Sequence, residues 1–349
     1  MRFTAWKIVA MVALTGSVAA CDGLNKETPP LPAPPDTGGD AATDTATDTA
    51  TDIATDIATD IAADTAADTT VDAEVDGSGA APAFLLGRMV DVSGATFTMG
   101  SPDIAAGARE IGRDQDEAQH EVTVANFAIM PYEVTQLQWR ASSGNQNPSG
   151  HAACDDCPVD SVDWYAAAAF ANWVSRREGL QECYGFSGDC EGAEVWGDGD
   201  AECGSVTFLG SSCAGYRLPT EAEWEFAYRA GTATAYYTGT PTAADDCEPL
   251  ATRMAWLGCN TDETKPVGGR EANSLGLFDM GGNVQEWVND TYALYNAPAV
   301  PAFWGAVDKV YRGGSFRSTA KLARAANRGF GVLMGDSLND IGFRLARAR

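Results

Sequence analysis

Histidine and basic residues are scarce in this chain of 349 residues. It has two histidines, His120 and His151, and 23 lysines and arginines against 49 aspartates and glutamates, which gives a formal net charge of −26. A surface with this excess of acid repels the phosphate backbone of nucleic acids, so we expect no DNA or RNA partner. The shortage of imidazole also argues against a zinc site built on histidine.

The apolar run near the N-terminus, residues 8–20, is too short for a permanent membrane span. It follows the positive residues Arg2 and Lys7 and ends in small residues directly before Cys21, as in a signal peptide. The sequence "VAAC" resembles the bacterial lipobox, in which the peptide is cut and the cysteine is lipidated. We therefore predict a lipoprotein signal peptide over residues 1–20, a lipid anchor on Cys21, and a location in the bacterial cell envelope, with the remaining chain on the periplasmic or extracellular side of a membrane. An ordinary signal peptide that has a cysteine nearby is the alternative.

Residues 21–82 are predicted to be a disordered linker after the lipidated cysteine. The linker begins with a proline-rich stretch, and from Asp36 to Asp76 an aspartate recurs at every fourth position, with mostly threonine and alanine between. Like charges four residues apart repel each other on a helix, and threonine is a weak helix former. Almost no large apolar side chain is present to offset the entropy of ordering. The segment is therefore expected to be a solvated stalk.

Eight cysteines remain after Cys21 is set aside, and an even number in an exported chain predicts disulfides. Sequence alone does not fix the connectivity of eight cysteines. Local spacing favours two short bridges and one nested pair: Cys154–Cys157, Cys247–Cys259, and Cys183–Cys213 enclosing Cys190–Cys203. A redox or zinc role for "CDDC" is the alternative.

Residues 83–349 contain no second linker and are predicted to form one domain. Glycine and tryptophan are frequent there, which favours a loop-rich fold over a helical bundle. Residues 89–101 predict a strand followed by a glycine turn, and residues 120–130 predict a second strand. A short helix is expected to begin near Thr135.

Two further helices carry end signals. In the first, Ser161 is the expected N-cap and Gly179 the expected stop. In the second, Thr220 and Glu223 form the T-x-x-E pattern of a capping box, and Gly231 is expected to end the helix after two turns.

The stretch "NSLGLFDMGGNVQEWVND" carries the most chemistry. Asp279 and Glu286 stand on either side of Gly281 and Gly282. Glycines allow backbone carbonyls to turn inward, and a set of oxygen ligands with carboxylates suits Ca²⁺. A helix start with Asn283 as the N-cap and Glu286 in its first turn is a second interpretation, and the two are compatible.

These stretches together resemble the formylglycine-generating enzyme family, also called sulfatase-modifying factor domains. The matching pieces are collinear and cover nearly all of residues 90–347: "GATFTMGS", "YEVTQLQW", "PVDSVDWYAAAAFANW", "GYRLPTEAEWEFAYRAG", "NSLGLFDMGGNVQEW", "YRGGSF" and "IGFRLAR". The resemblance implies a single compact α+β domain of the C-type-lectin-like kind, with many loops and little regular secondary structure.

The resemblance also implies that the chain lacks the two cysteines with which family enzymes bind copper. Family members that oxidise a cysteine of a client sulfatase hold Cu(I) between two thiolates shortly after "RGGS". Those positions fall at Ser318 and Ala323 here, and no cysteine follows Cys259. Since Cu(I) requires soft ligands such as thiolates, we expect no bound copper.

One family calcium site carries over residue by residue. The resemblance implies that Asp279 and Glu286 would supply side-chain oxygens and that Gly282 and Val284 would supply backbone carbonyls. The predicted role of this Ca²⁺ is structural.

Two functions remain open. The first is a binding module whose groove would hold an unknown peptide, glycan or envelope protein; its candidate residues are Ser315, Phe316, Arg317, Ser318 and Arg324. The basic residues of this region hint at an acidic partner, although internal ion pairing of Arg317, Lys321, Arg324 and Arg328 would explain them equally well. The second function is a divergent enzyme of the family, either a protein-modifying oxidoreductase or one with other chemistry in the same groove, such as Ser318 as a nucleophile, which would need a base.

Overall fold

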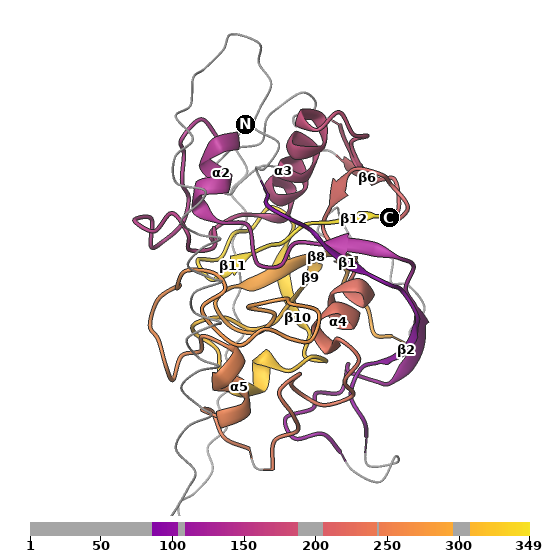
Figure 1. Ribbon diagram of the computed structural model, residues 1–349, viewed down its shortest axis with the longest axis vertical. Helices are drawn as coiled ribbons and strands as arrows, with labels where there is room; N and C mark the ends of the chain where they lie inside the picture. Colours follow the sequence, from indigo (N-terminus) through magenta and orange to yellow (C-terminus); the bar gives the residue numbers. More distant parts are fainter. Residues whose placement is uncertain (1–85, 104–108, 188–204, 243, 296–307) are drawn as a thin grey trace, which may run out of the picture. The chain divides into compact units, whose positions relative to one another are not determined.

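The computed structural model describes residues 86–103, 109–187, 205–242, 244–295 and 308–349. These residues form a loop-rich α+β fold, as predicted, with short helices and strands joined by long connections (Figure 1). The predicted signal peptide, Cys21, the linker and the pair Cys190–Cys203 lie outside the described residues.

Two four-stranded sheets carry the fold. The first has the order β1-β4-β12-β7, and all its pairs are antiparallel: β1 (Val90–Val92), β4 (Phe127–Ile129), β12 (Ala346–Ala348) and β7 (Tyr216–Arg217). The second has the order β10-β9-β8-β11, with a parallel pair only between β8 and β11: β10 (Gly329–Leu333), β9 (Asp308–Arg312), β8 (Gln285–Thr291) and β11 (Ile341–Gly342).

Two antiparallel strand pairs complete the sheets. The first joins β2 (Thr96–Met99) to β3 (His120–Thr123), and the second joins β5 (Tyr184–Ser187) to β6 (Ser205–Phe208). The prediction of one strand over 120–130 is therefore wrong in part. Burial alternates along β3, whereas all three residues of β4 are buried, so the segment divides between two sheets.

Three of the helices begin at side-chain caps. Helix α2 (Gln136–Ser142) starts at Thr135, as predicted, and α4 (Glu221–Arg229) starts with the predicted capping box of Thr220 and Glu223. Helix α3 (Trp164–Arg177) begins later than expected. Its N-cap is Asp163, which accepts a hydrogen bond from the backbone of Ala166 at 2.7 Å.

Ser161 is therefore not the cap of α3. It has a φ of 61°, and its hydroxyl instead donates to Asp160. The suggested helix start at Asn283 is also wrong, because residues 285–291 form β8. Asn283 has a φ of 58°, and its side-chain amide exchanges hydrogen bonds with the backbone of Lys265 at 3.0 and 3.1 Å.

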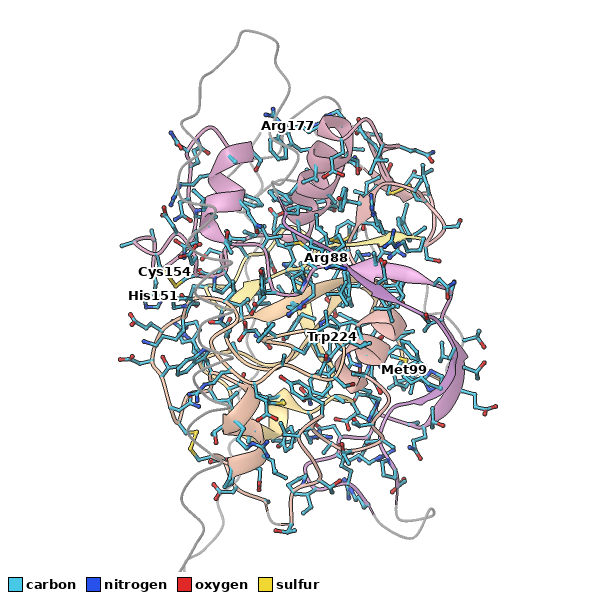
Figure 2. The ribbon with its side chains drawn as sticks, viewed as in Figure 1. Arg88, Met99, His151, Cys154, Arg177 and Trp224 are labelled. Atoms are coloured by element: carbon cyan, nitrogen blue, oxygen red, sulfur yellow. A yellow bond between two sulfur atoms is a disulfide. The ribbon has the colours of Figure 1, made fainter. Side chains whose placement is uncertain are left out.

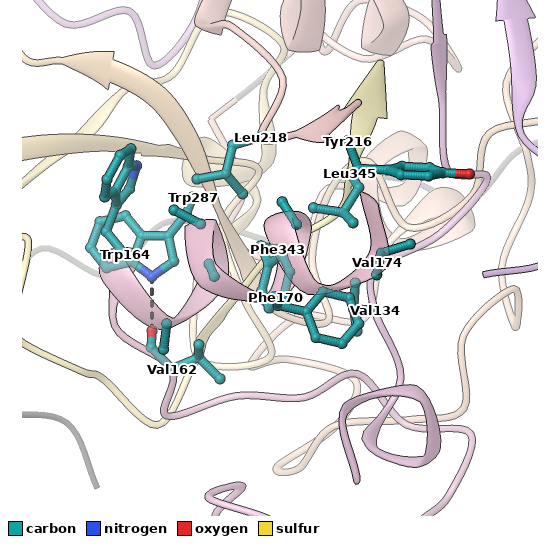
Figure 3. Close-up of a cluster of buried hydrophobic side chains, with 14 of the residues drawn as sticks. Val134, Val162, Trp164, Phe170, Val174, Tyr216, Leu218, Trp287, Phe343 and Leu345 are labelled. Atoms are coloured by element: carbon teal, nitrogen blue, oxygen red, sulfur yellow. Dashed lines mark hydrogen bonds between the residues drawn. The ribbon is translucent and has the colours of Figure 1, made fainter. Parts of the chain in front are cut away.

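The interior consists of two apolar clusters. One surrounds α3, and its Trp287 indole donates to the Val162 carbonyl at 2.8 Å (Figure 3). The other surrounds α4 and α5 (Pro249–Met254) and includes Trp224. The 3₁₀ helix η3 (Ala320–Ala323) follows β9 and packs its alanines into this second cluster. The turn between β9 and η3, which contains four of the five predicted groove residues, is thus fixed from both ends, and the fifth, Arg324, directly follows η3.

Candidate functional site

The rim, residues 313–318, is a tight turn held by its own hydrogen bonds. Gly313 and Gly314 have positive φ angles of 93° and 68°, which favour glycine. The Ser315 hydroxyl donates to Asp340 at 2.8 Å, and the Ser315 backbone N–H donates to the Ser318 hydroxyl at 2.9 Å. The rim is therefore a rigid structure with its serines already partnered.

The predicted groove residues differ in their exposure to solvent. Ser315, Phe316, Ser318 and Arg324 are buried, and Arg317 is exposed. The guanidinium of Arg317 lies 5.1 Å from the centre of the Phe316 ring. Of the five predicted residues, Arg317 is thus the one whose side chain faces solvent.

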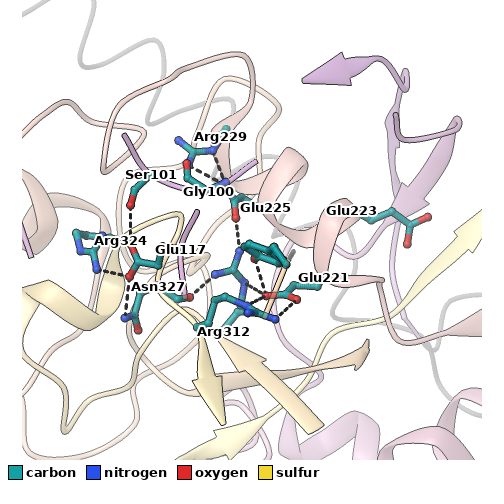
Figure 4. Close-up of polar contacts among 12 residues, drawn as sticks. Gly100, Ser101, Glu117, Glu221, Glu223, Glu225, Arg229, Arg312, Arg324 and Asn327 are labelled. Atoms are coloured by element: carbon teal, nitrogen blue, oxygen red, sulfur yellow. Dashed lines mark hydrogen bonds and ion pairs between the residues drawn. The ribbon is translucent and has the colours of Figure 1, made fainter. Parts of the chain in front are cut away.

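Arg324 is fully buried in an internal ion-pair network (Figure 4). Its guanidinium donates to Glu110 at 2.6 Å and to both carboxylate oxygens of Glu117, at 2.6 and 2.8 Å. Burial opposes the charge of Glu117, but the hydrogen bonds and charge of Arg324 outweigh it and lower the pKa of this carboxyl. Arg324 therefore holds two distant loop segments together.

The other basic residues near the rim are paired as well. Arg328 donates to both oxygens of Glu221, at 2.6 and 2.9 Å, and Lys321 lies 2.9 Å from Asp114. Internal pairing thus accounts for Lys321, Arg324 and Arg328. These residues give no support to an acidic partner.

His151, Gln285 and Asp340 lie close to the rim, although nothing in the sequence spacing indicates this. The His151 ring meets the Phe316 ring edge-to-face, with 5.6 Å between centroids, and Gln285 donates to Asp340 at 3.3 Å. Figure 2 shows His151 next to Cys154 at one side of the domain. Within the described residues, no hydrogen bond joins His151 to a serine. The described contacts therefore make no serine–imidazole pair, and the acceptor of the Ser315 hydroxyl is the Asp340 carboxylate.

The predicted calcium ligands fit a cation only in part. Asp279 is buried, and its Oδ1 has no hydrogen-bond partner among the described residues, as expected of an oxygen reserved for a cation. Glu286, in contrast, is fully occupied. Its oxygens accept from the Arg344 guanidinium at 2.7 Å each, and Oε2 also accepts from the Trp224 indole at 2.8 Å.

A second buried carboxylate lies near Asp279. Both oxygens of Glu133 are without partners in the described part of the chain, and burial, together with the negative charge of Asp279, raises the pKa of Glu133. The same region holds no group of three or more histidine, cysteine or acidic side chains arranged around a metal, as far as the described ranges extend. The calcium site remains a prediction, and Asp279 is the one of its two predicted side-chain ligands that has a buried oxygen without a described partner.

All six cysteines of the described part of the chain are in disulfides. The three bridges are those predicted: Cys154–Cys157, Cys183–Cys213 and Cys247–Cys259. The last bridge lies near the rim, since Gly258 N–H donates to the Ser318 carbonyl at 3.0 Å. Among the helices that the structure describes, none is both long and apolar enough to cross a bilayer.

The fold agrees with that of known proteins. Residues 78–349 match the family described as the sulfatase-modifying factor enzyme 1-like domain. The chain belongs to this family.

Individual relatives differ in what their names say they do. Over 221 residues the chain is 33% identical to the chaperone protein LppX of Paenibacillus barcinonensis, which covers 60% of this chain and 75% of that protein. Over 249 residues it is 29% identical to the formylglycine-generating enzyme of Mycobacterium tuberculosis, and the match covers 60% of this chain and 75% of that enzyme. Among solved structures, Treponema denticola variable protein 1 is similar with a TM-score of 0.63 and 27% identity, over 75% of this chain and 95% of that one.

Proposed function

We propose that the protein is an envelope lipoprotein whose sulfatase-modifying-factor-type domain binds a partner and does not oxidise cysteine. The proposal is carried by the chemistry of Ser318 and Ala323, which the resemblance places at the positions of the family's copper thiolates. A hydroxyl and a methyl group offer Cu(I) no soft ligand. The six described cysteines are bonded to one another in pairs, so none of them offers a free thiol.

A binding role is consistent with the rigidity of the rim. Hydrogen bonds among Ser315, Ser318 and Asp340 hold the rim. The chain that follows the rim is held by the ion pairs of Arg324 with Glu110 and Glu117. A surface that is ordered before the partner arrives loses less entropy on binding. The similarity to a protein named as a chaperone also supports contact with another protein.

The alternative, a divergent enzyme in the same groove, has weaker support. His151 lies close enough to Phe316 for a ring contact, but the Ser315 hydroxyl donates to the Asp340 carboxylate and not to an imidazole. The binding role therefore stands first.

The lipid anchor is part of this proposal and has its own test. The short apolar run before Cys21 predicts cleavage at that cysteine. Mass spectrometry of the mature N-terminus should find an acylated cysteine. A mature N-terminus at any other residue would remove the anchor from the proposal.

Loss of oxidase activity is tested with a cysteine-containing sulfatase peptide. The full chain is incubated with the peptide, Cu(I) and O₂, and conversion of the thiol to an aldehyde is followed by mass spectrometry. We expect no conversion above that of a sample without protein. Turnover of the peptide by the chain would refute the binding proposal.

A further inference from the structure

Two arginines near the rim form no ion pair within the described residues. Arg270 is half-buried and Arg317 is exposed. Each guanidinium lies against an aromatic ring instead of an acid: that of Arg270 is 3.6 Å from the centre of the Trp256 ring, and that of Arg317 is 5.1 Å from the centre of the Phe316 ring. We refer to Arg270 and Arg317 as the arginine pair.

Burial alternates along the segment at residues 255–258. Ala255 has extended backbone angles and is fully buried, as is Leu257, whereas Trp256 is partly exposed and Gly258 is exposed. Alternate residues of an extended segment point to the same side and lie about 6.5 Å apart. Positions 256 and 258 therefore reach the surface next to each other.

Each of these two positions holds one arginine of the pair. Arg270 lies on the Trp256 ring. Gly258 N–H donates to the Ser318 carbonyl at 3.0 Å, and a Cβ added at Gly258 would lie 3.3 Å from the Arg317 carbonyl oxygen. The arginine pair is thus anchored at neighbouring positions of one segment that runs along the rim.

Several donors at the Trp256–Arg270 stack have no acceptor. The indole N–H of Trp256 and the Nε–H of Arg270 are buried without a partner among the described residues. Asp279 is the acid whose charge acts on Arg270, but no ion pair between the two is present in the described structure. The Oδ2 of Asp279 accepts from Gly268 N–H instead. Donors that the protein does not satisfy favour a ligand that brings acceptors.

A guanidinium held against an aromatic ring is prepared for a carboxylate. Its planar fork can donate two parallel, charge-assisted hydrogen bonds to the two carboxylate oxygens. Stacking restricts the long side chain before the ligand arrives, so less entropy is lost on binding. The neighbouring cations Lys321, Arg324 and Arg328 are already paired with acids of the domain. The arginine pair therefore differs from them in being open to an external acid.

We propose that the arginine pair binds a carboxylate group of a partner peptide. This inference rests on the proposed binding function and names the chemistry of its partner. Residues 83–349 have a net charge of −15, the total of −26 less the −11 of residues 1–82, and this field repels a strongly acidic protein. The expected ligand is therefore a single carboxylate, at a chain end or on one side chain, in an otherwise uncharged stretch.

The test is a titration of the full chain with short peptides, followed by the indole N–H NMR signal of Trp256, which is assigned by its loss in Trp256→Phe. The probes are acetyl-Gly-Ser-X-Ser-Gly-amide with X as glutamate, glutamine or lysine. We expect the glutamate peptide to bind about ten-fold more tightly than the glutamine peptide, which corresponds to about 1.4 kcal/mol. The lysine peptide should leave the signal unmoved.

Two further probes identify the source of the carboxylate. One is acetyl-Gly-Ser-Gly with a free C-terminus, and the other is sodium acetate. If the free-acid peptide binds more tightly than the glutamate peptide, the ligand is a chain end, and if it binds more weakly, the ligand is a side chain; both results support the inference. Acetate that binds as tightly as the better peptide would overturn the peptide source of the carboxylate.

Variants of the pair and a matched control locate the effect. Arg317→Gln and Arg270→Gln each remove one guanidinium and should weaken binding of the glutamate peptide by about five-fold or more. Arg270→Lys keeps the charge without the fork and should cause a smaller loss. The control is Arg177→Gln, because Arg177 is also exposed and lies 4.9 Å from the centre of an indole ring, that of Trp173, but at the end of α3 (Figure 2). It should leave the binding unchanged.

Equal binding of the glutamate and glutamine peptides, no response of the Trp256 signal to either, or full binding by Arg317→Gln and Arg270→Lys would overturn the inference. These outcomes are separable from failure of the proposed function. Oxidation of the sulfatase peptide would refute the function and leave a preference for glutamate standing. Absent oxidation with no preference for glutamate would remove this inference and leave the function standing.

Discussion

Single side chains of this protein are most informative where a guanidinium is buried. Arg217, Arg312, Arg324 and Arg344 are fully buried, and each lies against a glutamate (Figure 4 shows two of them). A buried ion pair contributes little net stability when formed, but breaking it leaves an uncompensated charge. These arginines therefore act as obligatory structural contacts and do not form a surface for ligands.

Arg324→Met is expected to destabilise the fold by about 3–5 kcal/mol, because Glu110 and Glu117 lose their shared partner inside the protein. Urea denaturation should show a lower midpoint with an unchanged slope. Arg317→Met, at the exposed neighbouring arginine, should stay within about 0.5 kcal/mol of the wild type. Similar losses in the two variants would contradict the assigned roles.

The calcium prediction, in which Asp279 is a ligand, can be tested by the effect of chelation on the melting temperature. If Ca²⁺ is present at about 100 times its dissociation constant, it stabilises the fold by about 2.7 kcal/mol. Chelation with EDTA should therefore lower the melting temperature by about 5–10 °C, and excess Ca²⁺ should restore it.

The matched variant is Asp279→Ala, whose melting temperature should not respond to EDTA. Glu286→Ala is a poor choice, since it also removes the ion pair with Arg344. An EDTA-insensitive wild type would remove calcium from the account.

Among the helices and strands, those with local signals could be predicted from the sequence. Thr135, Thr220 and Glu223 cap helices through partners three residues away, and their spacing identifies them. The helix expected at Asn283 shows the limit. The bond of Asn283 to Lys265 and the pairing of β8 with β9 join distant segments, which no local pattern records.

The candidate site divides in the same way. The rim follows from the "RGGS" motif, and the three described disulfides follow from local spacing. The contacts of Arg324 with Glu110 and of Phe316 with His151 span more than 150 residues, and they could not be predicted. The sequence therefore could not decide whether these basic residues line an exposed groove or form internal ion pairs.

The disulfides offer a test at the level of elements. By the chain-entropy account, a bridge stabilises more as it closes a longer loop, about 4 kcal/mol for 31 residues and about 2 for four. Cys183→Ala with Cys213→Ala, across a separation of 30, should lower the unfolding free energy more than Cys154→Ala with Cys157→Ala, across a separation of 3. Cys183 and Cys213 also belong to the apolar cluster around α3, which adds to the difference. Equal losses in urea denaturation would count against this order.

At the scale of the whole molecule, the chain has the family fold, and we propose that its reactive centre is altered. Lys321 and Arg324, next to the rim, are paired internally, whereas Arg317 is exposed and has no ion pair among the described residues. A domain of this kind can present a preformed surface to a partner, which is the role that we propose for it.

The direct measurement of this claim is a Cu(I) titration of the full chain against a chromogenic chelator, with Ser318→Cys/Ala323→Cys as the matched variant. The wild-type chain should leave all Cu(I) with the chelator, because its described cysteines are in disulfides and residues 318 and 323 carry no thiolate. The double variant should withdraw about one equivalent. One equivalent bound by the wild-type chain would contradict the account.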